Sequence, residues 1–269
     1  EAMRQRSPGR VIGREMMVEH LHPMPAGFFA IADAFYDSLL SRPPAADPQL
    51  VSEDIARTES LLTPVDSLVG RYRVLQLTSV WPFEPIGTRK PYLDTLLLRT
   101  PIDSIASRLF QRDVSWAEAN EEQRLYFVRE GDDRSALQAA LARAQEYPFD
   151  DSGYLAAGSA FVSLGRLREA ETYYRAALDR RSSSNGFMMI GSIYLEEGYV
   201  QRALDPLKRS LELNAGNVQA RYNLAGALAL TGQLQEARSE AETVLKAVPG
   251  HIGARNLLAQ LPPASPTVQ

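Results

Sequence analysis

The second half of the chain repeats one pattern of apolar, small and glycine positions. Glycines recur at steps of 34, 33 and 34 residues, at Gly131, Gly165, Gly198 and Gly232. Three further columns keep the same register: a large apolar residue four before each glycine, a small residue five after it and an apolar residue thirteen after it. The columns are Phe127, Phe161, Tyr194 and Leu228; Ala136, Ala170, Ala203 and Ala237; and Ala144, Leu178, Leu211 and Leu245. A repeat of this length predicts stacked helical hairpins.

Each column has a physical reason. Glycine adopts the left-handed conformation that ends a helix, so the glycine column predicts the turn inside each hairpin. The small residue lets the two helices approach, and the large residue fills the space between them. Proline or polar turns then close the units, because proline does not continue a helix. The predicted units are 117–150, 151–183, 184–217 and 218–251, with a capping helix at 252–261.

These columns resemble those of the tetratricopeptide repeat family. The closest matches are Ala157-Gly158 with Phe161, Ile190-Gly191 with Tyr194, and Asn223-Leu224-Ala225 with Leu228. The first unit departs from the family, since Gln123-Arg124 stands where the family has Leu-Gly. The resemblance implies a mainly α fold, a solenoid of helical hairpins, and a function in protein–protein interaction.

In such a solenoid the first helix of each hairpin lines a concave groove. The expected partner-binding residues there are Leu155, Ser159, Met188, Ser192, Tyr222 and Asn223. They are small, apolar or uncharged, and the basic positions with which some family members clamp a carboxylate are Ser, Ala or Met. We therefore expect a protein or peptide partner with an apolar face. Two alternatives stay open: Met188 and Met189 belong partly to the core, or the groove holds the chain's own N-terminal part.

A second motif lies near the N-terminus, where Glu19-His20-Leu21-His22-Pro23 precedes Gly27. It resembles the last block of SGNH (GDSL-type) hydrolases, Asp-x-x-His-Pro-x-x-x-Gly. The resemblance implies that His22 is a general base for a serine nucleophile and that Glu19 orients it. The Gly-Asp-Ser block of that family is absent, so we expect no catalysis by this chain alone.

Three interpretations of this block stay open. The chain is the C-terminal part of a longer bacterial SGNH-type ester hydrolase with repeats, or the match is a coincidence, or the block is a vestige with a structural role. Because the sequence begins Glu1-Ala2-Met3 rather than with Met, we expect a fragment of a longer protein. The apolar face of a predicted helix at 26–40 is expected to pack on residues 50–115.

The middle of the chain predicts a helical connector. A Pro-rich break at 41–48 precedes helices at 49–62, 65–79, 91–98 and 101–111 and an aromatic loop at 81–87. Ser115 and Glu118 form a capping-box pattern that starts the first hairpin. The predicted organisation is a hydrolase-like remnant at 1–40, a connector at 41–116, the solenoid at 117–261 and a disordered tail at 262–269.

Composition excludes several classes of function. The chain of 269 residues has a net charge of -4 and no cysteine, so nothing favours nucleic acid, a disulfide or a thiol site. Glu19, His20 and His22 have no third His or Cys beside them, so we expect no metal, and no nucleotide fingerprint indicates a cofactor. No apolar run reaches the ~20 residues of a membrane span. Abundant alanine and arginine with scarce lysine suggest a bacterial source. A chain without cysteine suits the cytoplasm or the periplasm and cell envelope equally, so the compartment and the oligomeric state stay open.

Overall fold

The computed structural model describes residues 5–6, 30–34, 61–78 and 98–262. They fall in two compact units: 5–6, 30–34 and 70–78 in one, and 61–69 and 98–262 in the other. All regular structure in these residues is helical, which confirms the prediction of a mainly α fold.

Several predicted elements lie wholly or largely outside the described residues. They are the SGNH-like block with Glu19 and His22, the Pro-rich break, the loop at 81–87, the helix at 91–98 and the tail beyond residue 262. Of the helix predicted at 26–40, residues 30–34 are described and are helical. The predicted end of the helix at 49–62 is wrong, because residues 61 and 62 are not helical. Thr63 instead begins the next helix there as its capping residue.

Two connector helices are described. Helix α4 spans Pro64–Thr78 and α5 spans Pro101–Gln111, each with proline in its first turn. Thr63 and Asp66 cap α4 reciprocally, since the Thr63 hydroxyl donates to Asp66 Oδ2 (2.6 Å) and the Asp66 amide donates to Thr63 Oγ1 (3.2 Å). Thr100 and Asp103 form the same capping box on α5. Threonine and aspartate satisfy amide groups that a helix start leaves without partners.

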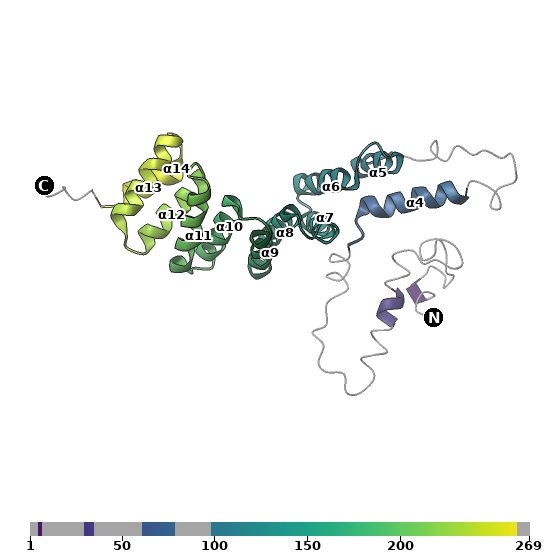
Figure 1. Cartoon of the computed structure of the whole chain (residues 1–269), viewed down its shortest axis with the longest axis horizontal. Coiled ribbons are helices and arrows are strands. Elements are labelled where there is room, and N and C mark those ends of the chain that lie inside the picture. The colour runs from purple at the N-terminus through teal and green to yellow at the C-terminus, as the bar shows by residue number, and fades with distance from the viewer. Residues whose placement is uncertain (1–4, 7–29, 35–60, 79–97, 263–269) are drawn as a thin grey trace, which may run out of the picture. The chain divides into compact units, whose positions relative to one another are not determined.

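Four helical hairpins and a final helix follow in order (Figure 1). Each helix from α5 onward packs on the next, and α12 also contacts both α10 and α14. The hairpins are α6 (Trp116–Glu130) with α7 (Asp133–Glu146), α8 (Asp151–Ser163) with α9 (Leu167–Arg180), α10 (Ser184–Glu196) with α11 (Val200–Leu213), and α12 (Val218–Leu230) with α13 (Leu234–Ala247); α14 spans Ile252–Gln260.

The glycine column ends the first helix of every hairpin, as predicted. Its φ angles are 72°, 70°, 79° and 81° at Gly131, Gly165, Gly198 and Gly232, in the left-handed region. At the second of these turns the Gly165 amide donates to Val162 O, and the Arg166 amide donates to Phe161 O, each at 2.9 Å. These bonds satisfy carbonyl groups at the helix end.

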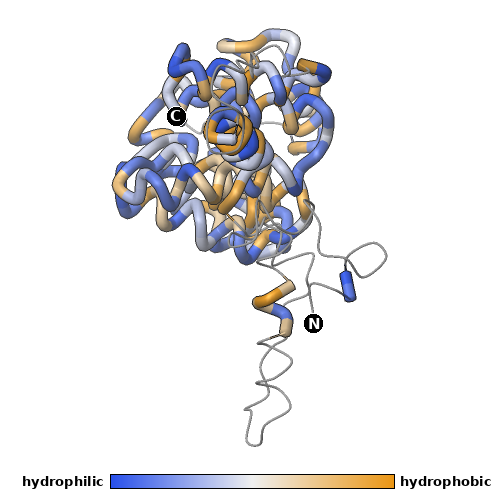
Figure 2. The backbone as a smooth tube through the Cα atoms, turned by 90° about the vertical axis from the view of Figure 1, so that its right-hand side faces the viewer, coloured by the Kyte–Doolittle hydropathy of each residue, from blue (hydrophilic) through white to orange (hydrophobic). Residues whose placement is uncertain are grey.

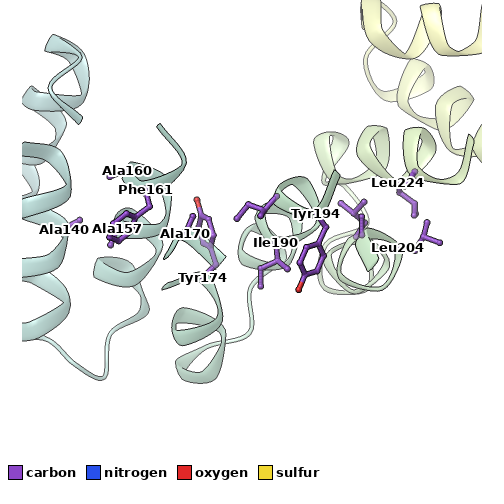
Figure 3. Close-up of a cluster of buried hydrophobic side chains, with 14 of the residues drawn as sticks. Ala140, Ala157, Ala160, Phe161, Ala170, Tyr174, Ile190, Tyr194, Leu204 and Leu224 are labelled. Atoms are coloured by element: carbon purple, nitrogen blue, oxygen red, sulfur yellow. The ribbon is translucent and has the colours of Figure 1, made fainter. Parts of the chain in front are cut away.

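The small and large columns form the core between helices (Figure 3). Ala136, Ala170, Ala203 and Ala237 are at most 1% exposed, and the large column is at most 8% exposed. Leu178 of the fourth column reaches the next hairpin, since a Cβ on Gly186 would lie 2.8 Å from Leu178 Cδ2. Figure 2 shows hydrophilic and hydrophobic stretches alternating along these helices, the pattern of amphipathic packing.

Candidate protein-binding face

The predicted partner-binding residues come from the first helices α8, α10 and α12. We call these positions together the first-helix face; its residues are Leu155, Ser159, Met188, Ser192, Tyr222 and Asn223. Ser159 is exposed and the others are half-buried. None of these residues carries a charge, and Leu155 also packs against the core.

The polar groups of α10 and α12 on this face form one chain of hydrogen bonds. Gln219 Nε2 donates to Asn223 Oδ1, and Asn223 Nδ2 donates to Ser192 Oγ, both at 2.8 Å. The Ser192 hydroxyl in turn donates to Met188 O at 2.9 Å. The Asn223 amide is therefore held in one orientation across two hairpins, and among the described residues no acceptor takes its second N–H hydrogen.

In the second hairpin the face is joined to the core by Tyr174 of α9. This ring is buried, and its hydroxyl hydrogen bonds with Ser159. Burial raises the pKa of Tyr174 to about 12, because the ionised form would lose its hydration. A Cβ on Gly158 would lie 2.9 Å from the Tyr174 ring, so this glycine lets the ring lie flat against α8.

Tyr222 has a structural role that its sequence position did not reveal. Its ring lies 4.7 Å from the imidazole of His251, and a Cβ on Gly253 would lie 2.6 Å from its hydroxyl oxygen. His251 caps α14 by accepting from the Ala254 amide at its Nδ1 (3.1 Å). Tyr222 therefore holds the final helix in place, so a change there alters more than the face itself.

The first hairpin has exposed apolar residues at equivalent places in its first helix, which the sequence interpretation missed. Leu125 and Val128 on α6 are 44% and 50% exposed. They stand at the places in their repeat that Ser159 and Val162 occupy in the next. The repeat register already placed Leu125 and Val128 at these equivalent positions, but the first hairpin departs from the family motif, so they were not recognised.

That departure has a structural explanation. Gln123 is 1% exposed, its Nε2 donates to Thr63 Oγ1 (2.9 Å), and its Oε1 accepts from the Val65 amide (3.3 Å). Trp116 Nε1 also donates to Asp66 Oδ1 at 2.8 Å. The start of α4 is thus docked on α6, and a leucine in place of Gln123 would leave buried polar groups without partners.

Ion pairs join the ends of the hairpins. Arg181, which follows α9, pairs with both carboxylate oxygens of Asp151 at the start of α8, at 2.8 and 3.0 Å. The Asp151 side chain is 4% exposed. At the preceding turn the Ser152 hydroxyl, aided by Arg143, holds the pKa of Asp150 below its usual range against the effect of burial. The Arg181–Asp151 pair ties the two ends of the second hairpin together, and Arg143 joins the first hairpin to the start of the second.

The described residues do not include the predicted catalytic pair. Glu19 and His22 lie outside the part of the chain that the structure describes. Within the described segments, no three or more His, Asp or Glu side chains are arranged to hold a metal ion. In the same segments no helix combines the length and apolarity of a bilayer span.

Comparison with known proteins gives matches over the repeats. Models described as tetratricopeptide repeat match residues 152–183 and 194–261. No curated protein sequence matches the chain significantly.

Similar solved structures include MamA from Desulfovibrio magneticus RS-1, with 20% identity over 53% of this chain and 81% of that one and a TM-score of 0.49. YrrB, described as a TPR protein with an unusual peptide-binding site, is 22% identical over 58% of this chain and 80% of that one, with a TM-score of 0.49. A thermophilic TPR protein from Thermus thermophilus, TTC0263, is 20% identical over 73% of this chain and 95% of that one, with a TM-score of 0.48. With the family matches and the helical hairpins together, residues 152–183 and 194–261 are tetratricopeptide repeats.

Proposed function

We propose that the first-helix face binds a peptide or helix of another protein that presents an apolar side. Tetratricopeptide repeats are protein-binding units whose stacked first helices form an extended surface. The observation that carries the proposal is the character of this face: uncharged residues on α8, α10 and α12, extended by the exposed Leu125 and Val128 on α6.

A charged ligand end is not the expected target. The face offers no Lys or Arg among its defining residues, so a carboxylate would lose hydration without gaining an ion pair. Met188 adds a flexible apolar side chain that adapts to different partners. The remaining N–H of Asn223 suits a backbone carbonyl of an extended or helical partner. Apolar contacts then supply affinity, and the amide fixes register.

The test starts from peptides selected from a random displayed library on the whole chain. Selected peptides are titrated calorimetrically against the parent and against Asn223→Ala and Val128→Lys. We expect each change to weaken binding by about five- to thirtyfold, since one lost contact of this kind is worth roughly 1–2 kcal/mol. Lys246→Ala on the exposed side of α13 is the matched control and should leave affinity unchanged.

Tyr222→Ala is a poorer test, because that ring also holds α14. Selected peptides whose affinity is the same for the parent, Asn223→Ala and Val128→Lys would show that the first-helix face is not the site. Peptides that are weakened equally by Lys246→Ala would show a general loss of fold.

A second candidate is favoured by the Glu19-x-x-His22 block alone. In it, this chain is the C-terminal part of a longer SGNH-type ester hydrolase, Glu19 and His22 complete a catalytic triad, and the repeats position the enzyme on its partner. Sequencing the coding region upstream of Glu1 tests it directly. A Gly-Asp-Ser block there supports the enzyme, and an upstream region without one removes this candidate.

A further inference from the structure

Because the hairpins repeat, the space between the two helices of a hairpin can be compared at equivalent positions in the second, third and fourth hairpins. Three positions matter at each: one early in the first helix, one in the large apolar column and one in the middle of the second helix. They are Tyr154, Phe161 and Tyr173 in the second hairpin; Phe187, Tyr194 and Pro206 in the third; and Arg221, Leu228 and Glu240 in the fourth.

At the second hairpin, aromatic rings fill this place. The ring of Tyr173 lies 5.1 Å from that of Phe161 and 6.2 Å from that of Tyr154, measured between centroids. Such tilted ring contacts stabilise beyond the area that they bury.

At the third hairpin, Tyr194 fills it and is held by charged groups. Its hydroxyl donates to Glu171 Oε1 (2.5 Å) and accepts from Arg175 Nη2 (2.6 Å). The guanidinium of Arg202 lies over the ring, 4.5 Å from its centroid. The third hairpin therefore fills this space with one ring, which has a cationic donor at its hydroxyl and a second cation over its face.

At the fourth hairpin, the ring is missing. Arg221 and Glu240 form an ion pair where the second hairpin has two tyrosine rings, and Leu228 stands where the others have Phe161 or Tyr194. A cavity of about 400 Å³ that is open to solvent lies between α11, α12 and α13, with Leu211, Leu224 and Leu228 among its lining. This volume lies within the range of pockets that hold small ligands or side chains.

Of the three charged residues around Tyr194, two have a different kind of counterpart here: Leu204 stands at the place of Glu171, and Glu236 at the place of Arg202. Lys208 stands at the place of Arg175, the donor to the Tyr194 hydroxyl, and lines the cavity. Glu236 stands at the place of Arg202, so a carboxylate replaces the guanidinium above the ring. Glu212, also on the rim, pairs with Arg209, whereas within the described residues Glu236 has no ion-pair partner.

We infer that this cavity binds the ring of a tyrosine next to a basic residue on a partner protein. The ring takes the space that Tyr194 fills one hairpin earlier, its hydroxyl accepts from Lys208, and the neighbouring cation pairs with Glu236. This surface is made by second helices and the buried side of α12, so it is separate from the first-helix face and does not depend on the proposed function.

The probe is tyramine, which carries a phenol ring and an ammonium group. It is titrated into the isotope-labelled whole chain, and amide shifts are followed in two-dimensional correlation spectra. We expect saturable shifts centred on Leu224, Leu228 and Glu236. Phenylpropionate bearing the same phenol but a carboxylate should bind about two- to fivefold more weakly, because its charge meets Glu236.

Two variants decide the outcome. Leu228→Phe restores the ring found in the other hairpins, so it should fill the cavity and abolish the tyramine shifts. Glu236→Gln, a surface change that leaves the core intact, should remove the preference for tyramine over the carboxylate. Shifts that are scattered, or that persist unchanged in Leu228→Phe, overturn the inference, as does an unchanged preference in Glu236→Gln. Asn223→Ala should bind tyramine as the parent does.

Discussion

Two glycines inside first helices give a sharp test of how closely the hairpins pack. Gly153 in α8 lies against α7: a Cβ there would be 2.5 Å from the Ala144 nitrogen and 2.8 Å from its Cα. Gly226 in α12 has no heavy atom within 4 Å of its ideal Cβ position. The same change to alanine therefore adds a methyl group to a backbone contact in one helix and to open space in the other.

The expected effects have opposite signs. Alanine in a helix interior is favoured over glycine by about 0.5–1 kcal/mol, so Gly226→Ala should stabilise the chain by that amount. Gly153→Ala gains part of the same helix preference for alanine, but its methyl group meets backbone atoms that no side-chain rotation can move. Overpacking typically costs about 1–3 kcal/mol, and with no flexible neighbour we expect a net loss of roughly 1–3 kcal/mol.

Urea denaturation followed by far-ultraviolet circular dichroism measures both free energies of unfolding. The slope with urea should be the same for both variants, because neither changes the surface exposed on unfolding. Equal midpoints for Gly153→Ala and Gly226→Ala would refute the close approach of α7 and α8. A loss in Gly226→Ala would show instead that α12 has a neighbour at that point.

Three further changes test contacts within the second hairpin and between α4 and α6. Arg181→Ala leaves the buried carboxylate of Asp151 without its partner and should cost about 1–3 kcal/mol in thermal or urea unfolding, whereas Arg209→Ala, in an exposed pair, should cost at most about 0.5 kcal/mol; equal costs would contradict the burial argument. Gln123→Leu should speed amide exchange at Val65, whose N–H loses its acceptor, and an unchanged rate would mean that this bond does not hold α4. The raised pKa of Tyr174 predicts a stability term that is complete below pH 10 and lost as the pH rises towards 12; Tyr174→Phe should flatten this alkaline loss in unfolding curves measured across that range.

The repeat register could be predicted from sequence because its causes are local. A glycine that ends a helix and a small residue that lets two helices approach impose the same demand in every hairpin. The positive φ angles of the glycine column and the burial of Ala170 and its equivalents follow from that demand. The residues of the first-helix face were chosen from the same register, since helices at equivalent places expose equivalent positions, and their role in binding stays a prediction.

What could not be predicted depends on partners far away in the chain. Tyr222 looks like a groove residue until His251 and Gly253 are placed against it. Gln123 looks like a worn repeat position until Thr63 lies beside it, 60 residues away in sequence. Periodicity shows which face of a helix is buried, but it does not show which distant segment covers that face.

Departures from the repeat columns consequently carry more information than the columns themselves. Gln123 in an apolar column marks the docking of α4, and Leu228 in a largely aromatic column marks the open cavity of the fourth hairpin. Ser210 is a third case: it is fully buried where the neighbouring repeats have Ala177 and Val244, and its hydroxyl donates to Ser184 O at 2.8 Å, joining α11 to the start of α10. Each exception replaces a packing contact with a specific polar contact or a vacancy, and in a stack of otherwise equivalent hairpins these are the places where one repeat acquires a role that the others lack.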